Sequence, residues 1–103
     1  MNDDNQAFIP PSFVALYVPP GRIKPTEPRH AIAARYELCE DMAQMLVDHA
    51  QTKLFELGVN EQEVLERVHR GLCAPGSGVS ADEARWVIRR LAELLGWPAL
   101  LLD

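Results

Sequence analysis

The chain contains one glycine-rich segment whose residue types could bind a phosphate group. Residues 71–76 begin and end with glycine, the spacing that opens a phosphate-binding loop. Ser77 and Gly78 stand where such a loop needs a lysine followed by serine or threonine. A nucleotide-hydrolysing domain of this type also needs several βαβ units of about 30 residues each, and 103 residues are too few to build it. We therefore expect an ordinary loop between helices here.

Two cysteines and three histidines are the side chains that could ligate a metal ion or act as a nucleophile and its base. His69 and Cys73 are four residues apart, but we expect Gly71 to end the helix between them. The sequence contains no CxxC pair and no HExxH motif. Cys39 falls on a predicted apolar helix face, where cysteine packs as a small hydrophobic residue. Cys73 is expected to be the more reactive thiol, because it would lie in the loop that follows the helix end at Gly71. We expect no metal site and no cofactor.

Acidic side chains are concentrated between residues 37 and 48, where two carboxylates could act as a general acid and base. Helical periodicity places them beside or opposite the apolar residues of the same segment, and such a face is usually the solvated one. No spacing in the sequence marks a catalytic triad either. We therefore expect a protein that is not an enzyme.

The better signal is for binding, and it lies near the C-terminal end. Arg85, Arg89 and Arg90 are close in sequence to Trp86, and Trp97 follows. Arginine and tryptophan are enriched among the residues that dominate the energy of protein interfaces, and arginine stacks on aromatic rings. These five residues are the candidate interaction surface. The alternative is that the arginines form ordinary ion pairs with acidic residues of their own helix.

The elements that position these residues are predicted to be helices, of which the first is long. From Arg29, apolar residues recur at steps of three and four until Gly58 supplies a left-handed C-terminal residue. The pattern predicts one helix of about 29 residues, roughly 43 Å long. Its expected buried face consists of Ile32, Tyr36, Cys39, Ala43, Leu46, Ala50, Leu54 and Leu57. Leu38, Met42 and Met45 widen this face, which could cover an N-terminal arm or a second copy of the chain.

Two shorter helices are predicted to follow, and an N-terminal capping motif marks the start of each. Asn60 with Glu63, and Ser80 with Glu83, match the capping box. The first of these helices is expected to stop near Gly71. The residues expected to be buried are Val64, Leu65, Val68 and Leu72 in the first helix, and Ala84, Val87, Ile88, Leu91, Leu94 and Leu95 in the second. The predicted fold class is mainly α, a small three-helix domain with one long helix and two shorter ones.

Proline divides the chain into parts. Six of the eight prolines lie between Pro10 and Pro28, where they prevent a long regular element. The predicted parts are a disordered tail at residues 1–9, a proline-rich arm at 10–28 and a helical domain at 29–103.

The arm contains one apolar segment, which fits either a short helical turn or a strand. Phe13, Leu16 and Tyr17 are the residues expected to anchor the arm on the helical core. A tail that remained in solvent would not need so many apolar residues.

The net charge of −5 is unevenly distributed. Residues 1–35 have a balance of +1, residues 36–72 have eight acidic and three basic residues, and residues 73–103 have a balance of −1. An acidic chain is a poor non-specific ligand of nucleic acid or anionic membranes. The sequence has no apolar run of about 18–20 residues and no signal-peptide pattern. We expect a cytoplasmic protein with reduced cysteines and no membrane association.

Five segments of the chain carry a resemblance to known proteins: residues 9–13, 15–17, 20–22, 34–41 and 86–97. Together they resemble a small family of uncharacterised betaproteobacterial proteins, some of which carry the description "ATPase with chaperone activity". The resemblance implies a bacterial cytoplasmic protein whose arm belongs to the domain. It supplies no catalytic residues that could be transferred to this chain.

These observations predict a non-enzymatic, helical protein-interaction module, an adaptor or a co-chaperone-like subunit. Its partner would be another protein, and the long helix could also pair with a second copy to form a homodimer. One alternative is a helical protein that binds nucleic acid through the third helix and through Arg22, Lys24 and Arg29. The acidic long helix argues against that alternative. The other is a small enzyme or ATP-binding protein, as the family description implies.

Overall fold

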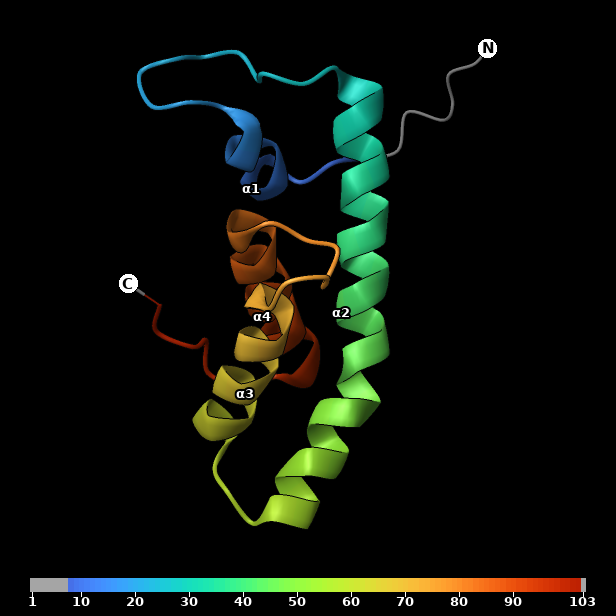
Figure 1. The fold of residues 1–103 in the computed structure, drawn as a ribbon, viewed down its shortest axis with the longest axis vertical. Coiled ribbons are helices and arrows are strands. Elements are labelled where there is room, and N and C mark those ends of the chain that lie inside the picture. The colour runs from blue at the N-terminus through green and yellow to red at the C-terminus, as the bar shows by residue number, and fades with distance from the viewer. Residues whose placement is uncertain (1–7, 103) are drawn as a thin grey trace. The chain divides into compact units, whose positions relative to one another are not determined.

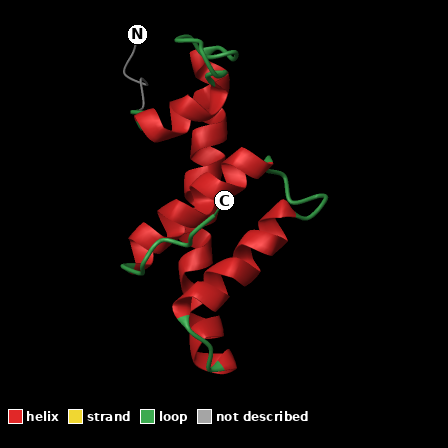
Figure 2. Cartoon of the chain, turned by 90° about the vertical axis from the view of Figure 1, so that its left-hand side faces the viewer, coloured by secondary structure: helices red, strands yellow, loops and turns green. Residues whose placement is uncertain are grey.

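A computed structural model describes residues 8–102 of the 103. The described chain consists of helices joined by loops, as Figure 2 shows. In chain order the helices are α1 (Pro11–Val14), the 3-10 turn η2 (Ala15–Tyr17), α2 (Arg29–Leu57), α3 (Glu61–Cys73) and α4 (Ala81–Leu95). The predicted mainly α fold, with one long and two shorter helices, is confirmed. Two compact units, Met1–Leu38 and Cys39–Asp103, divide the chain, and α2 runs from the first into the second.

In the first unit, the arm folds back on the first turns of α2. Phe13 in α1 is fully buried. Its ring centroid lies 5.6 Å from that of Tyr17 and 5.6 Å from that of Tyr36 on α2, distances typical of interacting aromatic rings. Thr26 closes the returning loop, because its backbone N–H donates to the Tyr17 carbonyl at 2.8 Å. The apolar segment of the arm is therefore a short helix, not a strand, with Leu16 half-buried beside it.

The predicted disordered tail at residues 1–9 lies outside the described residues, except for its last two positions. Phe8 is exposed, whereas Ile9 is buried. Ile9 thus belongs to the apolar interior together with Phe13.

The long helix has the predicted bounds. Gly58 follows its last residue with φ of 64°, a left-handed conformation that glycine adopts without strain. The residues of the expected face are buried or half-buried, apart from Leu57, which is partly exposed. One-sided periodicity at steps of three and four therefore identified the inner face of this helix correctly. Met45, which was expected to widen that face, is instead 75% exposed.

In the second unit, α3 and α4 lie side by side (Figure 1). Ser80 and Glu83 form the complete capping box at the start of α4, with reciprocal hydrogen bonds of 2.9 and 3.0 Å. At the start of α3 only half of the expected capping box forms: Asn60 accepts the Glu63 backbone N–H at 2.8 Å, whereas the Glu63 carboxylate pairs with Arg67. All the expected residues of α3, and Ala84, Val87, Ile88 and Leu91 of α4, are buried, whereas Leu94 and Leu95 are half-buried.

The expected end of α3 near Gly71 is wrong. The helix continues to Cys73 before the loop begins. A glycine inside a helix costs about 1 kcal/mol relative to alanine, and the buried Leu72 that follows it favours the last helical turn over a break.

Across residues 8–102, none of the helices combines the length and apolar character needed to cross a membrane.

Candidate protein-interaction groove

The five residues of the predicted Arg/Trp surface have different environments. Trp86 is buried, and Arg85 and Trp97 are half-buried. Arg89 is exposed. The helix continues to Leu95, where Gly96 adopts a left-handed conformation and leads into Trp97. Tryptophan at position 86 therefore contributes mainly to the interior, and the set does not form one exposed patch.

Arg90, the fifth member, is held by carboxylates inside the second unit. Its Nε donates to Glu40 Oε1 at 2.9 Å and its Nη2 donates to Glu40 Oε2 at 3.0 Å. Its Nη1 donates to Glu93 at 3.1 Å, and Gln44 donates to Glu40 Oε2 at 2.8 Å. The two parallel bonds are the forked geometry in which arginine binds a carboxylate most strongly. They connect α2 to α4 across 50 residues of sequence.

The electrostatics of this pair follow from the geometry. Hydrogen bonds from Arg90 hold the pKa of the Glu40 carboxyl below its ordinary value, against a smaller opposing effect of burial. The same hydrogen bonds raise the pKa of Arg90. Both groups are therefore charged at neutral pH, and Arg90 stabilises the helix packing.

His69 and Cys73 lie on one face of α3, because the helix does not end at Gly71. The Cys73 sulfur is 3.4 Å from His69 Nε2. No group of three or more potential metal ligands occurs among the residues that the structure describes. The pair by itself lacks the three or four ligands of a zinc site.

A groove of about 250 Å³ lies between the C-terminal part of α2 and α3. Each helix contributes residues at steps of three and four, which share one side of that helix and line the groove. The row from α2 is His49, Lys53 and Leu57, and the row from α3 is Val64, Arg67 and Val68. The two valines are buried and form the base, whereas the three basic residues lie at the opening, where they are half-buried or exposed.

The charges at the opening of the groove are partly balanced by acids of the same helices. Arg67 Nε is 2.9 Å from Glu63 Oε2, and Lys53 Nζ is 3.7 Å from Glu56 Oε1. Both pairs are exposed to solvent, and exposed pairs contribute only about 0.2–1 kcal/mol. A carboxylate brought by another molecule can therefore replace either acid at small cost.

Sequence reasoning missed this groove. The helix period was visible for α2 and for α3 separately, and Leu57, Val64 and Val68 were all expected to be buried. Leu57 is instead 42% exposed, because the groove opens beside it. The spacing of His49, Lys53 and Leu57, one helical turn apart, would have been a weak signal that these residues line a partly exposed groove.

Comparisons of the chain with protein-family models, with curated proteins and with solved structures give no match. The resemblance of five segments to a betaproteobacterial family thus stays a prediction.

Proposed function

We propose that the chain is a non-enzymatic protein-interaction module that binds, in the groove between α2 and α3, an apolar side chain flanked by acidic residues of a partner protein. The observation that carries this proposal is the combination of a buried valine base with three basic side chains at the opening. Interfaces obtain most of their energy from a few anchor residues that fill such pockets.

The size of the groove supports a side chain of a protein as its occupant. Sites for small organic ligands and cofactors usually measure about 300–1,000 Å³, and this groove measures about 250 Å³. Burial of one leucine- or phenylalanine-sized group contributes about 1.5–3 kcal/mol. The groove is therefore suited to one anchor residue of a larger interface.

The charge pattern supports an acidic sequence around that anchor. The charged side chains that line the groove are basic, although the chain as a whole has a net charge of −5. Opposite charge at the edge of an interface mainly accelerates association and selects the partner. We further propose a cytoplasmic location, because the structure does not join Cys39 and Cys73 in a disulfide.

The proposal can be tested by NMR titration of the full-length, ¹⁵N-labelled chain with a short capped peptide that has one phenylalanine between glutamates. We expect the largest amide shifts at Lys53, Leu57, Arg67 and Val68. Peptides with alanine in place of phenylalanine, or lysine in place of glutamate, should bind more weakly by at least about fivefold, the effect of losing an anchor worth more than 1 kcal/mol.

The chain offers a matched pair of variants for this experiment. Leu57 and Leu38 are both on α2 and are 42% and 41% exposed, but only Leu57 lines the groove. Leu57→Ala should lower the affinity of the chain for the peptide by about fivefold. Leu38→Ala should leave that affinity unchanged. Equal effects of the two substitutions, or peptide-induced shifts outside the groove only, would contradict the proposal.

A further inference from the structure

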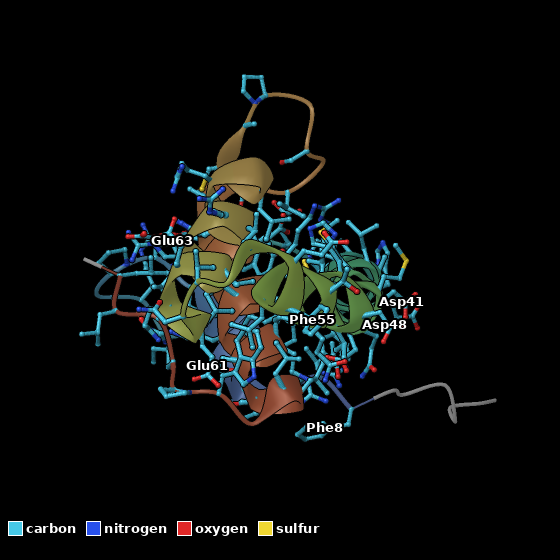
Figure 3. All side chains as sticks on the ribbon, turned by 90° about the horizontal axis from the view of Figure 1, so that it is seen from below. Phe8, Asp41, Asp48, Phe55, Glu61 and Glu63 are labelled. Atoms are coloured by element: carbon cyan, nitrogen blue, oxygen red, sulfur yellow. The ribbon has the colours of Figure 1, made fainter. Side chains whose placement is uncertain are left out.

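A second surface lies on the solvent-exposed side of α2, and it adjoins the groove at His49. It comprises Asp41, Met45, Asp48, Thr52 and Phe55, which we call the outer face. Their spacing of four, three, four and three residues keeps them on one side of the helix over about 21 Å. All five side chains are exposed. In Figure 3, which views α2 from its C-terminal end, Asp41 and Asp48 project from the same side of the helix.

We propose that the outer face binds a basic amphipathic helix of a second partner protein. The spacing of the five residues is that of the contact positions in a pair of helices packed along their length. A partner helix of about 15 residues would cover the whole face. This proposal is independent of the groove and extends the module to two partners.

The outer face has two large apolar side chains, and both are mostly exposed to solvent. Met45 is 75% exposed and Phe55 is 89% exposed. Both are large enough to anchor a partner, and methionine adapts its shape to different apolar surfaces. The exposed ring of Phe55 also offers its face to a cation, so a lysine or arginine beside it would be attracted.

The charged part of the outer face favours a basic occupant. Among the described residues, the side chains of Asp41 and Asp48 have no hydrogen-bond or ion-pair partner. They are seven residues apart, and Met45 lies between them. Lysine or arginine at matching positions of a partner helix would pair with both carboxylates while its apolar residues cover Met45.

A second copy of this chain is a less suitable occupant. If two outer faces packed so that each covered the whole of the other, Asp48 of one copy would approach Asp48 of the other, whether the helices ran parallel or antiparallel. Like charges in an interface disfavour association. The charge pattern thus selects a partner of opposite sign over self-association through this face.

The outer face and the groove can be occupied at the same time. Phe55 follows Lys53 by two residues, which places the two side chains about 200° apart around the helix. The groove offers basic groups, whereas the outer face offers carboxylates. One helix therefore presents basic side chains along one side and carboxylates along an adjoining side, with His49 at the border between them. This arrangement suits a protein that links two different partners.

The test uses a fluorescently labelled, 18-residue helical peptide with lysine at positions seven residues apart and leucine at the intervening contact positions. A control peptide has glutamate in place of each lysine. We expect the full-length chain to bind the lysine peptide and to bind the glutamate peptide at least about tenfold more weakly, as charge complementarity requires. Affinity for the lysine peptide should fall as salt is raised.

Variants of the chain localise the binding. The double variant Asp41→Lys with Asp48→Lys should lower the affinity for the lysine peptide by about tenfold or more. Phe55→Ala should lower this affinity by about fivefold. Glu27→Lys with Glu66→Lys makes the same change of net charge at exposed positions elsewhere and should have little effect. Leu57→Ala in the groove should also have no effect, so that failure of one proposal is distinguishable from failure of the other.

Three results would overturn the inference. The first is equal affinity of the chain for the two peptides, and the second is an equal loss of affinity in the two lysine double variants. The third is a mass of twice 11.5 kDa by light scattering for the unmodified chain, together with a monomer mass for the Phe55→Ala variant. The last result would show that a second copy occupies the outer face.

Discussion

The forked ion pair between Glu40 and Arg90 leads to a prediction about stability. The notable point is that Arg90 belongs to the sequence-predicted interaction surface, yet its guanidinium is 2.9 and 3.0 Å from the two oxygens of Glu40. We predict that replacing it lowers the free energy of unfolding. The perturbation is a double-mutant cycle with Glu40→Gln and Arg90→Gln.

The magnitude follows from burial and geometry. The Arg90 and Glu40 side chains are 33% and 18% exposed. Hydrogen bonds to charged groups contribute about 1.5–3 kcal/mol when buried, whereas fully exposed pairs contribute about 0.2–1 kcal/mol. A half-buried, forked pair should therefore have a coupling energy of about 1–2 kcal/mol. Each kcal/mol lost should lower Tm by about 4–8 °C in a domain of this size.

The pH dependence of the coupling has a definite sign. The pKa of Glu40 is lower in the folded chain than in the unfolded chain. Its contribution is therefore complete above the unfolded pKa of about 4.3 and is lost as the pH falls through the lower, folded value. The coupling should be present at pH 7 and should disappear in strongly acidic solution.

The assay is urea denaturation of the four proteins of the cycle, followed by far-UV circular dichroism at pH 7 and at acid pH. Arg89→Gln is the matched control, because Arg89 is the exposed neighbour of Arg90 on the same helix, and it should change stability by less than about 0.5 kcal/mol. A coupling energy below about 0.3 kcal/mol at pH 7, or one that does not change with pH, would refute the reasoning.

Two further predictions concern the arm and the last helix. Phe13→Ala removes a fully buried ring that contacts Tyr17 and Tyr36, and we expect a loss of about 3–5 kcal/mol in the packing of the arm. Limited proteolysis checks this prediction, since cleavage between residues 18 and 28 should accelerate; an unchanged cleavage rate would mean that the ring does not hold the arm. Ser80→Ala removes one half of the capping box of α4 and should cost about 0.5–2 kcal/mol. Thermal denaturation measures that loss, with Ser77→Ala in the preceding loop as its control, and equal effects of the two substitutions would contradict the role of the cap.

The sequence by itself determined the secondary structure and the inner faces of the helices. Asn60, Ser80 and Glu83 form the expected caps, and Gly58 ends the long helix. These features depend on hydrogen bonds and backbone conformations among residues only a few positions apart. The local sequence is therefore sufficient to specify them. Gly71 is the local exception, because the burial of Leu72 outweighed the preference of one glycine.

Only the tertiary structure decided which charged and aromatic residues face solvent. The sequence grouped Trp86 and Arg90 in one surface, but the packing of α4 buries the ring, and Glu40 engages the guanidinium from a position 50 residues away. The groove likewise depends on the tertiary structure, because its lining comes from two helices, α2 and α3. Pairings of this kind depend on how each helix is rotated and spaced against its neighbour. The period of a single helix fixes which residues share a face, but it does not fix what lies opposite that face.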